Sequence, residues 1–218
     1  MTAAPAPTLA EEIVLLSLDD ETGRPVGRLG MAPDLALAGA LIMDLALAGR
    51  VDTDRDRLWV VDSTPTWDKV ADRILAALDT PGAPGDARGA LVLLAREVPA
   101  AREALLDRLV ASGVLRREEG RVLWVFPDRR HPKGSGREMA EDARARLRRL
   151  LLAEEIPEPR DALLLGLVRA SGLLPLLFSS DELLRIQDWL ELVTRIESLN
   201  RSLGAAVAEV RAARSRPH

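Results

Sequence analysis

The segment from Pro33 to Gly49 (PDLALAGALIMDLALAG) is apolar on nearly every side. A helix of this kind is stable in water only when other elements cover it all round. Pro33 suits the first helical turn, Asp34 suits the positive end of the helix dipole, and Gly49 supplies a C-terminal stop. The segment therefore predicts a central, buried helix around which the rest of the chain is packed.

Further helices and two β-hairpins are expected to supply this cover. The hairpins are a small one within residues 51–62 and a larger one at 114–126, whose turn is placed at Glu118-Glu119-Gly120 and which leads into a polar loop at 127–136. Amphipathic segments with capping residues predict helices at 9–18 (starting near Thr8 and ending in a short extended piece), 67–78 (with Thr66 as the cap), 86–97, 99–112, 137–153, 159–171, 179–196 and 199–214.

These elements favour one fold class. The strands are too few and too short for the parallel sheet of a doubly wound nucleotide-binding fold. The sequence predicts a mostly α fold: a single-domain helical bundle with one prominent β-hairpin and a second small hairpin. The domain is expected to cover residues 9–214, between a disordered N-terminal tail of residues 1–8 and a tail of residues 215–218.

Several function classes are excluded by what the chain lacks. It has no Cys, which excludes thiolate metal sites, and only two His, His131 and His218, so a His-rich metal site or a Ser-His-Asp triad would have to rest on His131 alone. Neither of the glycine-rich phosphate loops, GxGxxG or GxxxxGK[ST], occurs. We therefore expect no enzyme, no cofactor and no metal. The start MTAAPAPT is unlike a signal peptide and no apolar run is long enough to span a bilayer, which predicts a cytoplasmic protein with at most peripheral contact at the inner face of the membrane.

The charge is unevenly distributed along the chain. The formal net charge is −4, yet the segment from Arg116 to Arg149 holds eleven basic and six acidic residues and carries +5. Of the 30 basic residues 28 are Arg, a side chain that binds phosphate with two parallel hydrogen bonds. This excess of Arg over Lys also indicates a GC-rich genome and predicts a bacterial source. The segment predicts a basic membrane-facing patch. The alternative is a solvated helix with ion pairs between Glu138, Glu141 and Asp142 and the arginines 144, 146 and 148.

The larger hairpin allows two functional predictions, an apolar contact surface and a DNA-binding module. Trp124 and Phe126 are predicted to leave an apolar side of the hairpin open to a membrane or a partner. The stretch from Arg102 to Phe126 also has the helix and hairpin order of a winged-helix DNA-binding module. The acids Glu118 and Glu119 at the expected tip repel a DNA backbone, so nucleic acid is the less favoured partner.

Four sequence blocks resemble the Golgi phosphoprotein 3 family, which includes the yeast sorting adaptor. They are EEIVLLSLDDETG, LALAGALIMDLALAGRVDTD, REALLDRLVASGVL, and VLWVF followed by His131-Pro132, in this order. The resemblance covers residues 9–214 and implies a non-enzymatic, mostly helical domain with a hydrophobic hairpin that supports oligomerisation and membrane contact. It also implies binding of phosphatidylinositol 4-phosphate in a basic pocket and, for eukaryotic members, adaptor function for Golgi glycosyltransferases.

The family's headgroup residues are only partly present. An ungapped alignment matches Arg102, whereas the other three positions fall on Leu29, Ala38 and Pro99. Arg28 and Arg96 are close enough in the implied fold to complete a substitute anion site with Arg102.

Two functional hypotheses remain. The first is a peripheral membrane protein that binds anionic phospholipid headgroups through Arg28, Arg96 and Arg102. The second is an adaptor or homo-oligomer whose hairpin, with Trp124 and Phe126, contacts a membrane enzyme, another protein or a second copy.

Overall fold

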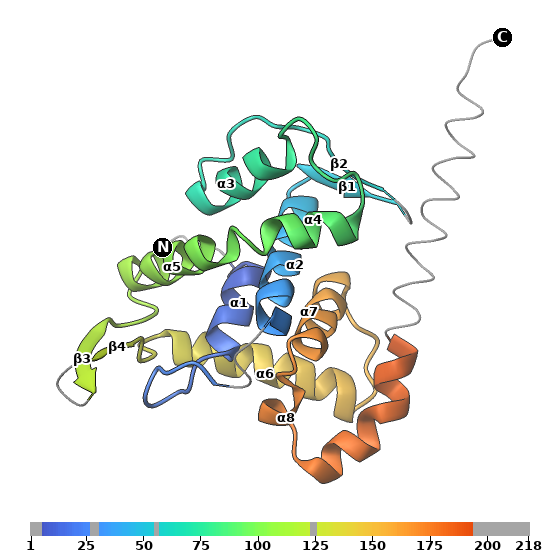
Figure 1. Cartoon of the computed structure of the whole chain (residues 1–218). Helices are drawn as coiled ribbons and strands as arrows, with labels where there is room; N and C mark the ends of the chain where they lie inside the picture. Colours follow the sequence, from blue (N-terminus) through green and yellow to red (C-terminus); the bar gives the residue numbers. More distant parts are fainter. Residues whose placement is uncertain (1–5, 27–30, 55–56, 123–125, 194–218) are drawn as a thin grey trace, which may run out of the picture.

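The computed structural model describes residues 6–26, 31–54, 57–122 and 126–193 (Figure 1). Its elements are α1 (Leu9–Leu16), α2 (Met31–Leu47), β1 (Val51–Thr53), β2 (Leu58–Val60), α3 (Lys69–Leu78), α4 (Ala87–Leu94), α5 (Val98–Ala111), β3 (Glu118–Val122), β4 (Phe126–Arg130), α6 (Gly136–Leu152), α7 (Pro159–Ala170) and α8 (Leu174–Leu177). A further helix covers residues 180–193. The mostly α fold with one prominent and one small antiparallel hairpin is confirmed.

Helix α2 stands in the middle of the molecule, as its apolar sequence predicts (Figure 1). It contacts α1, α3, α4, α5, α7 and β1. Residues on several of its sides are buried, among them Leu37, Ala40, Leu41 and Leu45. Since apolar surface gains about 25 cal/mol for each Å² removed from water, this helix anchors the hydrophobic core.

The predicted helix ends are largely correct. Helix α1 begins after Thr8, whose hydroxyl accepts from the Glu11 amide while the Glu11 carboxylate accepts from the Thr8 amide. Helices α5, α6 and α7 begin and end within one residue of their predicted limits. Helix α4 stops at Leu94, three residues early, because the chain turns there before Pro99 enters the first turn of α5. The predicted helix at 199–214 lies outside the described residues.

The predicted start of α3 is wrong. Thr66 does not cap this helix; the cap is Asp68, whose carboxylate accepts from the amides of Val70 and Ala71. The Thr66 hydroxyl instead donates to Asp72 at 2.6 Å. Trp67 therefore lies outside the helix, with a positive φ of 65° and a side chain that is 94% exposed.

The predicted turn of the larger hairpin is also wrong. Glu118, Glu119 and Gly120 lie within β3, where Glu118 faces Arg130 and Glu119 faces Arg129. This backbone pairing sets the register of the hairpin. The first residues of the predicted polar loop, Pro127 to Arg130, consequently belong to β4.

The predicted apolar face of the hairpin, with Trp124 and Phe126, stays a prediction. In the described residues strand β3 ends at Val122 and strand β4 begins at Phe126. Trp124 itself and the side chain of Phe126 lie outside the described residues. Within the described part of the chain, no helix combines the length and hydropathy needed to cross a membrane.

Candidate functional site

The surface along α4 carries one of the predicted site residues, Arg96. Its exposed side chain lines an open hollow of about 430 Å³. The described residues that line this hollow are Pro84, Asp86, Arg88, Gly89, Val92, Leu93 and Arg96. Arg88, which also lines the hollow, is exposed as well, and neither arginine forms an ion pair with a described residue. The hollow thus presents two guanidinium groups without an ion pair and one carboxylate, that of Asp86.

Arg102, the residue that matches the family pocket, has different surroundings. It projects from the first half of α5, and its Nη2 donates to Asp34 Oδ1 in the first turn of α2 at 2.6 Å. Both side chains are partly exposed, Arg102 by 40% and Asp34 by 35%. A guanidinium has five N–H donors, so this contact leaves most of the Arg102 fork available to a second acceptor.

The structure places the three predicted headgroup residues as follows. Arg96 lines the hollow beside α4. Arg102 lies six residues later, on α5, where it contacts Asp34 in the first turn of α2; it does not line that hollow. Arg28 lies outside the described residues. Arg88 was missed by sequence reasoning because nothing in the family pattern points to it; its signal is its spacing of eight residues from Arg96.

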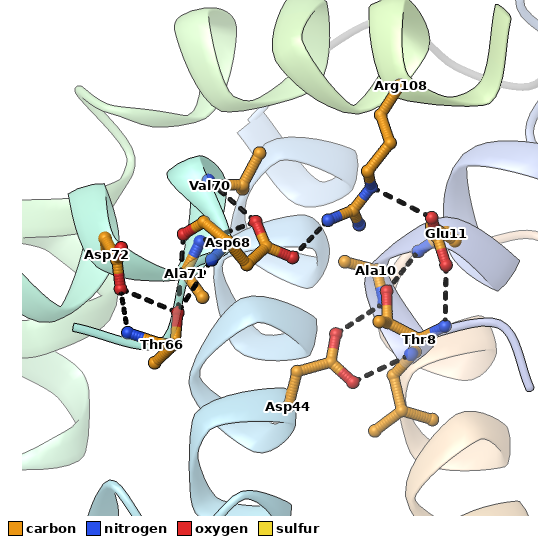
Figure 2. Close-up of polar contacts among 11 residues, drawn as sticks. Thr8, Ala10, Glu11, Asp44, Thr66, Asp68, Val70, Ala71, Asp72 and Arg108 are labelled. Carbon is orange, nitrogen blue, oxygen red and sulfur yellow. Dashed lines mark hydrogen bonds and ion pairs between the residues drawn. The ribbon is translucent and has the colours of Figure 1, made fainter. Parts of the chain in front are cut away.

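A second cluster lies between α1, α2, α3 and α5, and its centre is Arg108 (Figure 2). Arg108 Nε lies 3.0 Å from Glu11 Oε1 on α1, and its Nη1 donates to Asp68 at the start of α3. Asp44 of α2 accepts from the amides of Leu9 and Ala10, at 2.8 and 2.9 Å. Burial raises the pKa of Asp44, although these hydrogen bonds act in the opposite direction.

The Arg108 cluster borders a cavity of about 190 Å³ with a mostly aliphatic wall. Each of its acids already accepts hydrogen bonds from a helix N-terminus, Asp44 from α1 and Asp68 from α3. We assign the cluster to structure, because it joins four helices and leaves no carboxylate free for acid–base chemistry. An acid within an almost wholly apolar helix was the sequence signal for it, since a buried carboxylate needs partners.

In the basic segment from Arg116 to Arg149, three arginines of α6 are bonded to carboxylates inside the molecule, whereas Arg116, Arg137 and Arg149 are exposed and have no carboxylate partner among the described residues. The Asp142–Arg146 pair forms as the alternative interpretation expected. The other acids come from distant elements. Asp20 binds Arg144, Glu12 and Asp161 bind Arg146, and Glu182 binds Arg148.

One buried carboxylate, Glu12, and one partly exposed carboxylate, Asp20, show how strongly these pairs are integrated into the fold. Glu12 is only 1% exposed, and burial raises its pKa although Arg146 and Arg160 lie against it. Burial acts the same way on Asp20, but hydrogen bonds from Arg144 and Lys133 outweigh it and hold the pKa of Asp20 at about 2. The positive charge of α6 is therefore largely balanced by acids of the remaining chain.

The turn after α1 belongs to the same structural network. The side chain of Lys133 is fully buried and donates to the Leu18 carbonyl at 2.8 Å and to Asp20. Gly23 has a φ of 63°, and a Cβ there would lie 2.1 Å from the carbonyl carbon of His131. His131 is 7% exposed and lies in this contact, so its neighbourhood in the described residues serves packing rather than catalysis.

The winged-helix alternative gains no support from α5 and the hairpin. Arg102 and Arg108 of α5 are both bonded to acids, and β3 begins with Glu118 and Glu119. A phosphate backbone that approached this unit would have to displace those acids. Among the described residues there is also no group of His, Asp and Glu side chains suited to hold a metal ion.

Comparison with known proteins agrees with the four sequence blocks. The sequence model of Golgi phosphoprotein 3 (GPP34) matches residues 9–215. A search of curated proteins finds no significant match. Because the match covers nearly the whole chain, the protein belongs to the Golgi phosphoprotein 3 family.

Proposed function

We propose that the protein is a non-enzymatic, peripheral membrane protein that binds the phosphate of anionic lipid headgroups on its α4–α5 surface, from the cytoplasmic side. The residues that carry this role are Arg96 and Arg102, with Arg28 as the third predicted contact. A phosphoinositide-like headgroup is the ligand that the family resemblance implies.

One observation carries the proposal: Arg96 is exposed in an open hollow and has no ion pair among the described residues. Most arginines of α6 are bonded to carboxylates. A guanidinium without an internal partner is available for a phosphate, which it binds with two parallel hydrogen bonds. Each basic residue near an anionic membrane contributes about 1 kcal/mol of attraction.

Arg102 supports the same surface from α5. Its single contact with Asp34 is partly solvated, and such exposed pairs contribute only about 0–1 kcal/mol. A lipid phosphate at the membrane surface therefore competes with Asp34 at little cost. The match of Arg102 to the family pocket position adds a second, independent reason to include it.

Flotation with liposomes of graded phosphatidylserine content tests this proposal. We expect binding that rises with anionic lipid, falls with added salt, and weakens in the Arg96→Ala and Arg102→Ala variants, because each removes one phosphate contact. The matched control is Arg185→Ala, which removes another exposed arginine without an ion pair among the described residues, on the helix at 180–193.

Equal recovery on neutral and anionic liposomes, or recovery on neither, contradicts the proposal. Equal losses in Arg96→Ala and Arg185→Ala contradict the assignment of the α4–α5 surface. If no liposome binds, the adaptor or oligomer hypothesis takes its place, and sedimentation of the Trp124→Ala variant then shows whether the hairpin holds copies together.

A further inference from the structure

The exposed face of α4 has a regular pattern that the family pocket does not include. Arg88 and Val92 lie four residues apart on one side of α4, and Arg96 lies four residues further, in the turn that follows the end of α4 at Leu94. All three side chains are exposed, Val92 by 60%, and all three line the same hollow of about 430 Å³. The face is thus a row of cation, aliphatic side chain and cation.

The position of Arg88 in α4 is electrostatically unfavourable for the helix. It occupies the first turn of α4, where the helix dipole disfavours a cation, and this turn contains no acid. The nearest described acid in the hollow, Asp86, uses its carboxylate to accept from the Gly89 amide at 2.9 Å. A residue that lowers helix stability without an internal partner is typical of a site that meets a ligand.

The chemistry of the row selects its occupant. Two unpaired guanidinium groups favour a surface rich in phosphate, and an exposed valine between them favours an apolar layer just beneath it. A bilayer with anionic lipids offers both, and reversible anchoring needs both signals. Helix α4 has eight residues and is about 12 Å long, with Arg88 in its first turn and Arg96 just beyond its end, so the two arginines are far enough apart to meet neighbouring headgroups.

We infer that Arg88, Val92 and Arg96 form a bilayer-docking row in which each arginine contacts the phosphate of a separate anionic lipid and Val92 enters the interface between them. This inference rests on the proposed function and deepens it, since it adds Arg88 and Val92 as membrane contacts. It makes binding bivalent, so a soluble headgroup that occupies one arginine binds far more weakly than a bilayer that engages both.

The test measures partition of the full chain onto phosphatidylserine vesicles by co-sedimentation. At about 1 kcal/mol for each basic residue, Arg88→Ala and Arg96→Ala each lower the partition coefficient about fivefold, and the double variant lowers it about 25-fold. The control is the double variant Lys69→Ala and Arg185→Ala, which changes the net charge equally at two other exposed positions. Val92→Asp weakens binding further by repulsion, and glycerol phosphate competes only weakly.

The outcomes separate the inference from the proposed function. If wild-type protein binds and Arg96→Ala reduces binding, while Arg88→Ala and Val92→Asp behave like the control, the docking row is wrong and the proposed function stands. If glycerol phosphate displaces the protein from vesicles at low concentration, the site holds one soluble phosphate and the bilayer contact is overturned. If wild-type protein does not bind, both fail. Thermal unfolding of each variant confirms that the exposed substitutions leave the fold intact.

Discussion

Three arginines of α6 have surroundings opposite to those of Arg88 in α4 and of Arg96 just after it. On α6, Arg144, Arg146 and Arg148 are bonded to carboxylates from the turn after α1, from α1 itself, and from the C-terminal helices. On the α4 surface, Arg88 and Arg96 have no ion pair among the described residues. The local excess of positive charge in the sequence therefore does not tell which guanidinium groups are free: three arginines of α6 are paired, whereas Arg149 of the same helix is exposed without an ion pair among the described residues.

This difference shows how a local charge count relates to function. A count along the chain does not include acids that the fold brings in from elsewhere. The positive charge of α6 serves to hold the N-terminal part of the chain against α6 and α7, and removal of its partners tests stability. The positive charge of α4 contributes nothing visible to the fold, and its removal tests binding.

The largest expected effect is on Glu12. The Glu12→Ala substitution leaves Arg146 and Arg160 beside a buried hole, and loss of one partner from a buried ion pair costs about 3–5 kcal/mol. Urea unfolding measures the change in the free energy of unfolding. Asp188→Ala, on an exposed face, is the control. A loss in Glu12→Ala no larger than in this control contradicts the view that the α6 arginines are structural.

A smaller effect appears in the acid range and concerns Asp20. Its pKa is lowered from 3.8 to about 2, so the carboxylate stabilises the fold above about pH 4. This contribution is lost as the pH falls from about 4 towards 2, because the unfolded chain takes up the proton first. The free energy of unfolding of wild-type protein and Asp20→Asn is expected to converge over this interval. A difference that stays constant from pH 4 to pH 2 disproves the Arg144 and Lys133 contacts as its source.

Much of the fold follows from local sequence patterns. The uncharged stretch around α2 predicts the central helix, and caps such as Thr8 and Gly113 mark helix ends that depend only on neighbouring residues. The errors arise where pairing with residues further along the chain determines the local structure. The Glu118-Glu119-Gly120 stretch has the composition of a turn, but its backbone pairs with residues 128–130 across the hairpin and is part of a strand.

The candidate site was less predictable for the same reason. Arg96 and Arg102 were found from the resemblance, but whether each guanidinium is free depends on contacts such as Arg102 with Asp34, 68 residues away. The α6 network was missed because Arg146 and Glu12 are 134 residues apart. Only the packing of α1 against α6 brings these two residues together.

The most direct test of the contrast between α4 and α6 measures vesicle binding and stability together for two variants, Arg96→Ala and Arg144→Ala. We predict that Arg96→Ala lowers the partition onto phosphatidylserine vesicles about fivefold and changes the free energy of unfolding by less than about 0.5 kcal/mol. Arg144→Ala is predicted to lower the free energy of unfolding, because Asp20 loses two hydrogen bonds, while the folded protein binds vesicles as before. Loss of vesicle binding in Arg144→Ala with none in Arg96→Ala contradicts the account.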